Sequence, residues 1–198
     1  MQDPVWLRSL IWTDYRLAVL FTVIIPLILL IWAFAQKADA IARLLTIYWR
    51  VSSLLAISVY LLMAAIPAGF ISGIMARILI PISLWFWVDL NEEIADRPSG
   101  PLKLCFNAWR WAISIYTVIG AIATLPFLQC AFSQEALAGS FCRTFLEPPL
   151  LFKEYFHPNT QVGFLGFLGY AGLIFYVGCL IYFVFIKLGK QGRSAIPQ

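Results

Sequence analysis

The chain has 198 residues, of which 62% are hydrophobic and only 12% are charged, and its formal net charge is +4. Soluble domains carry roughly 25% charged residues, and a water-soluble core of this size could not hide so much apolar surface. The composition therefore excludes a soluble globular protein. It predicts a single all-α transmembrane domain over residues 1–198, a polytopic helix bundle in the membrane.

The N-terminal segment, 1–16, mixes tryptophan, leucine and isoleucine with Arg8, Asp14 and Arg16. Its apolar face is irregular, so we expect only a short interfacial helix there. A charge-free run at 17–36 follows, and its length matches the roughly 20 residues that one membrane helix needs. Pro26 lies inside this run and predicts a kink in the first span.

Further apolar stretches predict three more spans, separated from the first by a polar connection at 37–50. We expect these spans at Val51–Ile66, Phe70–Val88 and Trp109–Leu128. The alternative is four spans, with residues 70–88 entering the membrane and returning on the same side as a re-entrant segment. Five spans are preferred, because 70–88 is long enough to cross and a buried re-entrant segment is rarer.

The longest polar segment, 129–162, is expected as an extracytoplasmic loop, and the fifth span lies within Pro158–Ile186. With five spans, nine of the 14 Lys and Arg residues fall on one side, which places the C-terminus in the cytoplasm. The four-span topology yields the same nine-to-five division, so charge does not separate the two. Both place 89–108 and the tail in the cytoplasm and 129–162 outside it.

Two of the four cysteines, Cys130 and Cys142, lie in the loop expected outside the cytoplasm. That compartment favours disulfides, and closing this loop would stabilise the fold by about 3 kcal/mol. We therefore predict a Cys130–Cys142 disulfide, the alternative being two free thiols. Cys105 and Cys179 are expected to be reduced.

An acidic run between tryptophan pairs holds four carboxylates within eight positions, Asp89, Glu92, Glu93 and Asp96. We interpret it as a partner-binding patch for a basic partner, the alternative being a solvated helix end at the membrane surface. A Mg²⁺ site for a pyrophosphate substrate would need a second acidic cluster facing this one, and the chain has one cluster.

A second partner-binding candidate is the glycine row at 163, 166, 169 and 172, with Gly166 and Gly169 at its centre. Glycines at steps of three remove side chains from one helix face, so another helix, a flat pigment or a lipid tail can approach closely. Arg77 is a charge in the interior of a predicted span, Phe70–Val88. Such a charge either pairs within the bundle or snorkels to the nearby interface.

Several function classes lack their motifs in this sequence. A single histidine excludes an internal bis-His haem, and there is no HExxH, G-x-S-x-G or P-loop motif. We expect no catalytic residue, no metal site, no haem and no nucleic-acid partner. The cofactor is unknown, and a bound lipid, chlorophyll or carotenoid stays open.

Five stretches carry a family resemblance: DPVWLRSLIWTDYRLAVLF at 3–21, IYWRVSSLLAISVY at 47–60, ARILIPISLWFWVDLNEEIADRP at 76–98, FLEPPLLFKEYFHPNT at 145–160 and KLGKQGRSA at 187–195. The chain resembles an uncharacterised cyanobacterial family of small multi-spanning membrane proteins, a domain of unknown function. The resemblance covers nearly the whole chain. It implies a thylakoid or plasma-membrane location in a photosynthetic cell, and no activity or site.

Three functional hypotheses follow. The first is a non-enzymatic accessory, assembly or scaffold protein of a membrane complex, a photosystem or a similar assembly. The second is a small transporter or ion carrier, suggested by Arg77, Pro26 and Pro81 as features of broken helices. The third is a membrane-embedded transferase that uses the acidic run. The first is preferred, because catalytic motifs and an inverted repeat are both lacking in the sequence.

Overall fold

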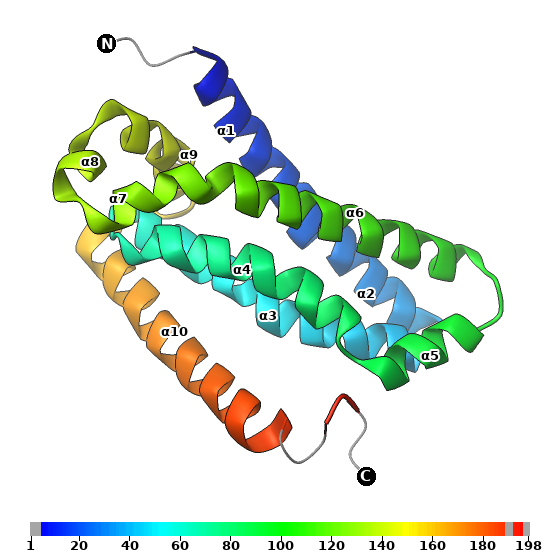
Figure 1. The fold of residues 1–198 in the computed structure, drawn as a ribbon. Coiled ribbons are helices and arrows are strands. Elements are labelled where there is room, and N and C mark those ends of the chain that lie inside the picture. The colour runs from blue at the N-terminus through cyan, green and yellow to red at the C-terminus, as the bar shows by residue number, and fades with distance from the viewer. Residues whose placement is uncertain (1–4, 189–191, 196–198) are drawn as a thin grey trace.

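The computed structural model describes residues 5–188 and 192–195. Every regular element in those residues is helical, and five helices are long and apolar enough to cross a membrane (Figure 1). These helices are Val5–Ala35, Asp39–Met63, Ala68–Trp85, Pro101–Phe132 and Val162–Lys187. The predicted all-α bundle with five spans is confirmed. The re-entrant alternative is wrong, because α4 (Ala68–Trp85) is one continuous helix packed along α3 (Asp39–Met63).

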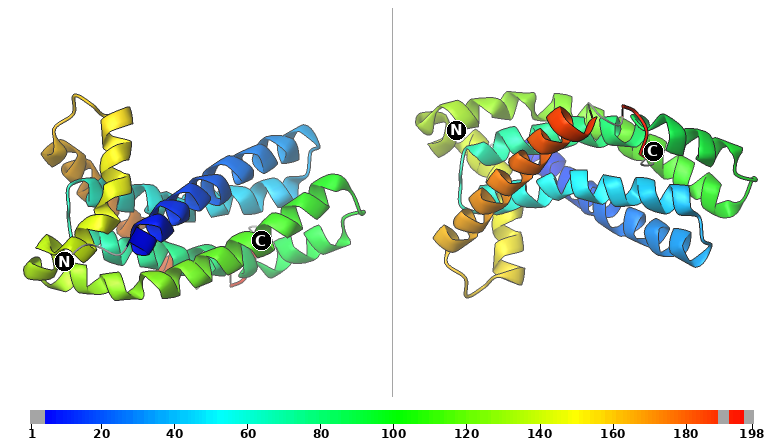
Figure 2. Two further views of the ribbon diagram at one scale, coloured as in Figure 1. Left: turned by 90° about the horizontal axis from the view of Figure 1, so that it is seen from above. Right: turned by 90° about the horizontal axis from the view of Figure 1, so that it is seen from below.

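Short helices cover the two ends of the bundle, and we name the ends after them. At the α5 end, α5 (Val88–Asp96) connects α4 to α6 (Pro101–Thr124). At the α9 end, α6 continues into a short 3₁₀ turn and three helices before α10 (Val162–Tyr182) begins. These elements are η2 (Leu125–Leu128), α7 (Gln129–Phe132), α8 (Gln134–Ala138) and α9 (Ser140–Phe156). Figure 2 shows α9 running across the long axis of the bundle.

The N-terminal segment differs from its prediction. The short interfacial helix expected at 1–16 is wrong, since α1 (Val5–Ala18) runs on through η1 (Val19–Ile24) into α2 (Ile25–Ala35). A helix keeps its backbone hydrogen bonds through the headgroup layer, where charged side chains still reach water. The charges at its start therefore mark the edge of the hydrocarbon and not the end of the helix.

The same reasoning corrects two other boundaries. The polar connection expected at 37–50 is only a short turn, because α3 begins at Asp39. The fourth span begins at Pro101 instead of Trp109, with proline in the first turn of α6, where its missing N–H costs nothing.

Pro26 is accommodated by a π-helical turn, η1, and by two side chains from other helices. The Ile25 N–H donates to the Leu20 carbonyl in this π turn, and Pro26 has no N–H, so the carbonyls of Phe21 and Thr22 lack their usual backbone donors. Trp109 Nε1 donates to the Phe21 carbonyl at 2.9 Å, and the Tyr48 hydroxyl donates to the Thr22 carbonyl at 2.8 Å. The Tyr48 and Trp109 rings also pack edge to face, with centroids 5.0 Å apart. The first span is thus fastened to α3 and α6 where its own hydrogen bonding is interrupted.

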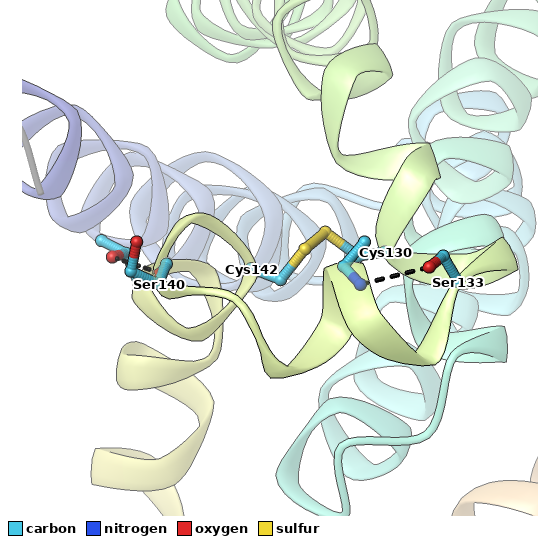
Figure 3. Close-up of a disulfide and its surroundings, with 6 residues drawn as sticks. Cys130, Ser133, Ser140 and Cys142 are labelled. Carbon is cyan, nitrogen blue, oxygen red and sulfur yellow. Dashed lines mark hydrogen bonds between the residues drawn. A yellow bond between two sulfur atoms is a disulfide. The ribbon is translucent and has the colours of Figure 1, made fainter. Parts of the chain in front are cut away.

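The segment 129–162, expected as a loop, is mostly helical and is joined internally by a disulfide. Cys130 on α7 and Cys142 on α9 are bonded to each other, with Cα atoms 5.9 Å apart, and both are buried (Figure 3). Ser133 caps α8 by accepting the Ala136 N–H at 3.2 Å. Phe127 and Phe145 pack beside the disulfide, so this end of the bundle has its own apolar core.

Candidate functional site

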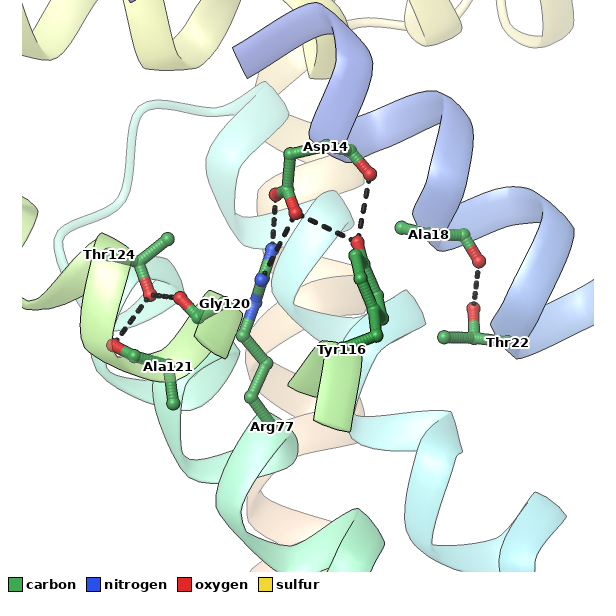
Figure 4. A network of polar contacts seen from close by, with 8 residues as sticks. All are labelled: Asp14, Ala18, Thr22, Arg77, Tyr116, Gly120, Ala121 and Thr124. Atoms are coloured by element: carbon green, nitrogen blue, oxygen red, sulfur yellow. Dashed lines mark hydrogen bonds and ion pairs between the residues drawn. The ribbon is translucent and has the colours of Figure 1, made fainter. Parts of the chain in front are cut away.

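Arg77 lies near the middle of α4 and is only 9% exposed. Its guanidinium meets the carboxylate of Asp14 on α1, with Nη1 donating to Oδ1 at 3.2 Å and Nη2 forming an ion pair with Oδ2 (Figure 4). The planar guanidinium suits such a two-point contact with a carboxylate. Of the two alternatives left open by the sequence, the structure has Arg77 paired inside the bundle.

Two residues of α6 complete the cluster around Asp14 and Arg77. The Tyr116 hydroxyl donates to Asp14 Oδ1 at 2.8 Å and to the Asp14 carbonyl at 2.9 Å. One turn further along, Gly120 leaves the space that the arginine occupies. A Cβ at this position would overlap Arg77 Nη1 and lie 3.0 Å from Cζ. We call Asp14, Arg77, Tyr116 and Gly120 the charge cluster.

The charge cluster joins α1, α4 and α6 through opposite charges and hydrogen bonds that satisfy one another. The Asp14 carboxylate accepts from both Arg77 nitrogens and from Tyr116, so neither charge is left alone in a low-dielectric region. Breaking such a pair by removing one partner typically costs about 3–5 kcal/mol. Asp14 was missed because 1–16 was expected to form a short helix separate from the bundle, whereas α1 continues into the first span. Its signal was its place as the only acidic residue between positions 5 and 35.

A second buried arginine, Arg110 of α6, lies toward the α5 end and is 8% exposed. It stacks on the Trp85 ring, with Cζ 3.7 Å from the centroid, and Nη1 donates to Asn91 Oδ1 at 2.6 Å. Within the described residues no carboxylate pairs with it. Sequence reasoning grouped Arg110 with the cytoplasmic charges. In the structure its contacts with Trp85 and Asn91 hold α5 against α4 and α6.

The acidic run forms α5, and its four carboxylates have different surroundings. Leu90 and Ile94 bury one face of the helix in the core, and Glu92, Glu93 and Asp96 are exposed on the other. Asp89 is engaged by the tail instead, since its Oδ2 accepts the Ala195 N–H at 2.8 Å and the Ser194 hydroxyl at 3.1 Å. The predicted patch of four is thereby reduced to three exposed carboxylates. Beside it, a hollow of 310 Å³ is lined by Glu93, Asp96 and Arg97 together with apolar side chains.

The glycine row packs against α3 of the same chain, so its assignment as a partner-binding face needs correction. A Cβ at Gly166 would lie 2.8 Å from the Ala64 Cβ, and one at Gly169 would lie 3.0 Å from the Leu61 backbone nitrogen. Both glycines are buried within the bundle. The predicted close helix approach is present, but the partner helix is internal. The opposite face of α10 therefore remains for other contacts.

The remaining polar residues of the described chain do not form a metal site. No group of three His, Cys, Asp or Glu side chains that could hold a metal ion occurs among them. His157 pairs with Tyr60 of α3, its Nε2 lying 3.0 Å from the hydroxyl. Cys105 and Cys179 are free thiols.

Comparison with known proteins identifies a family whose model covers almost the whole bundle. No curated protein and no solved structure matches the chain. The family model described as "protein of unknown function (DUF3177)" matches residues 8–196, which include the charge cluster, the acidic helix and the disulfide. The chain therefore belongs to this family, DUF3177.

Proposed function

We propose that this protein is a non-enzymatic accessory, assembly or scaffold protein that binds a membrane complex through the outer face of α10. The observation that carries the proposal is how little of α10 the rest of the chain covers. Only Leu165, Gly166 and Gly169 of this helix are buried, all near its start. The other described spans bury more of their surface against one another.

The outer face of α10 has the composition of a helix-packing surface. Gly163, Ala171 and Gly178 lie on one side of the helix. Apart from the neighbouring residues and backbone of α10 itself, no described part of the chain lies within 4 Å of a Cβ placed at Gly163 or Gly178. The large exposed side chains Phe167 and Ile174 stand beside them. Small residues between large ones let a second helix approach closely in lipid, where packing drives association. We therefore assign this face to a transmembrane helix of the partner complex.

The exposed carboxylates Glu92, Glu93 and Asp96 support a second contact, at the α5 end. A basic surface of the partner would relieve their mutual repulsion. The excess of Lys and Arg residues at this end supports a cytoplasmic location for it. The resemblance to a cyanobacterial family suggests a photosynthetic complex, in a thylakoid or plasma membrane.

Affinity purification in mild detergent tests the proposal. The wild-type chain should co-purify with a stoichiometric complex, and Gly178→Leu should reduce the yield of that complex at least tenfold. Ala123→Leu is the matched control, because Ala123 is an exposed small residue on another span, α6. Recovery of only a monomer or homodimer that catalyses flux or turnover in liposomes would contradict the proposal and favour a carrier or an enzyme.

A further inference from the structure

A groove at the α9 end lies between α1 and α9, outside the charge cluster. It is shallow and open on its outer side, has a volume of about 500 Å³, and is lined by Val5, Arg8, Ser9, Trp12, Arg16 and Leu151. Arg8, Trp12 and Arg16 follow at intervals of four, so they share one face of α1. The groove thus combines two cations and an indole with apolar walls.

The depth of the groove matches the headgroup layer of a bilayer. The charge-free run begins directly after Arg16, and its 20 residues, 17–36, rise about 30 Å, the thickness of the hydrocarbon core. Arg16 therefore marks the hydrocarbon boundary, and Arg8 lies about 12 Å farther out at 1.5 Å per residue. Lipid phosphates occupy this layer, in which tryptophan is also enriched.

The groove has one uncompensated positive charge. Arg8 Nε donates to Glu147 Oε2 at 2.7 Å, and Trp12 Nε1 donates to the same oxygen at 3.3 Å. Glu147 thereby neutralises Arg8 and fixes α9 beside α1. Arg16 is exposed, and within the described residues it has neither an ion pair nor a hydrogen bond. An anion at this level would complement Arg16.

An apolar surface continues from Arg16 toward the α5 end. Leu20, Ile24, Leu27 and Ile31 follow Arg16 along the first span at helical spacing, and all are exposed. Along the helix axis, residues 16 and 31 are about 22 Å apart, close to the length of an extended acyl chain. A ligand with both an anionic head and a long apolar tail fits this arrangement, whereas a free anion would contact only Arg16 and leave the apolar row uncovered.

We propose that the groove binds an anionic membrane lipid, with Arg16 on the headgroup phosphate or sulfonate and an acyl chain along α1 and α2. Arg8 and Trp12, positioned by Glu147, form the outer wall of the site. Leu151 of α9 closes the groove on its apolar side. This site is separate from the outer face of α10 and does not depend on the function proposed above.

Native mass spectrometry and thermal unfolding of the purified full chain test the site, with phosphatidylglycerol as the probe and phosphatidylcholine as the neutral comparison. Wild-type protein should retain phosphatidylglycerol and be stabilised by it. Arg16→Gln should weaken its apparent affinity about tenfold, the effect of one lost charge-assisted hydrogen bond. Arg143→Gln removes an exposed arginine elsewhere on α9 and should leave the affinity unchanged.

A second variant keeps both charges. Leu151→Trp should fill the groove and lower phosphatidylglycerol retention even though both arginines remain. Equal retention of the two lipids, or equal affinities of Arg16→Gln and Arg143→Gln, would overturn the proposal. Stabilisation by inorganic phosphate as strong as that by phosphatidylglycerol would also overturn it, since the ligand would then be a free anion.

Discussion

The contact between Gly120 and Arg77 allows a sharp test of the charge cluster by Gly120→Ala. In a helix interior this change is normally favourable by about 0.5–1 kcal/mol. Here the added Cβ would overlap Arg77 Nη1, so the guanidinium must shift and the hydrogen bond from Nη1 to Asp14 Oδ1 is lost. Losing one hydrogen bond between charged groups costs about 1.5–3 kcal/mol, which exceeds the helix-propensity gain. We therefore expect Gly120→Ala to destabilise the protein by about 1–2 kcal/mol.

The assay is reversible unfolding in mixed detergent–dodecyl sulfate micelles, followed by tryptophan fluorescence. Gly73→Ala on α4 is the matched control, because a Cβ there meets only Ser58 atoms at 3.9 Å, an ordinary contact. It should be neutral or slightly stabilising. In an Arg77→Leu background the guanidinium is absent, so Gly120→Ala should no longer lower the free energy of unfolding. The reasoning is refuted if Gly120→Ala matches Gly73→Ala, or if its full cost persists without the arginine.

Three other outcomes are expected. Single cysteines introduced at Ser99 and Ser140, in a protein whose two free cysteines have been replaced, should react with impermeant thiol reagents from opposite sides of the membrane. Reaction of both from the same side would contradict five spans. Non-reducing mass spectrometry of the peptide 129–153 should show the linked disulfide, and two alkylatable thiols would refute it. Tyr48→Phe should lower the free energy of unfolding by about 1 kcal/mol in the same assay, because it removes the hydroxyl that donates to the otherwise unpaired Thr22 carbonyl. Tyr182→Phe, at an exposed hydroxyl, should cost nothing measurable.

The number of spans could be predicted from the sequence, but their ends could not. Long apolar runs report the hydrocarbon thickness, and five of them, one interrupted by Arg77, predict five helices. The helices themselves extend into the headgroup layer, which is why α3 begins at Asp39 and α6 at Pro101. This error concealed the charge cluster, since Asp14 was assigned to a separate short helix and was not considered as a partner for Arg77.

The glycine row shows a different limit. Its spacing predicted close helix approach correctly, because spacing determines which residues share a helix face. It carried no information on which helix approaches, and α3 occupies that face through Leu61 and Ala64. Arg110 illustrates the same limit for charges. Its position near an aromatic edge suggested a solvated residue, whereas its stacking on Trp85 depends on tertiary packing that no local pattern records.

The pairing of Pro26 with side chains of later helices has a consequence for biogenesis. The chain is synthesised from its N-terminus, so the first span is made before Tyr48 and well before Trp109. Until those residues arrive, the carbonyls of Phe21 and Thr22 have no donor from the protein, and lipid tails cannot supply one. The nascent first helix is therefore incomplete by itself. Tyr48 donates to the Thr22 carbonyl once α3 is inserted, but the Phe21 carbonyl has no donor until α6 brings Trp109. We therefore expect the first helix to remain next to the translocon, or with a chaperone that supplies donors, until more than half of the chain has been made.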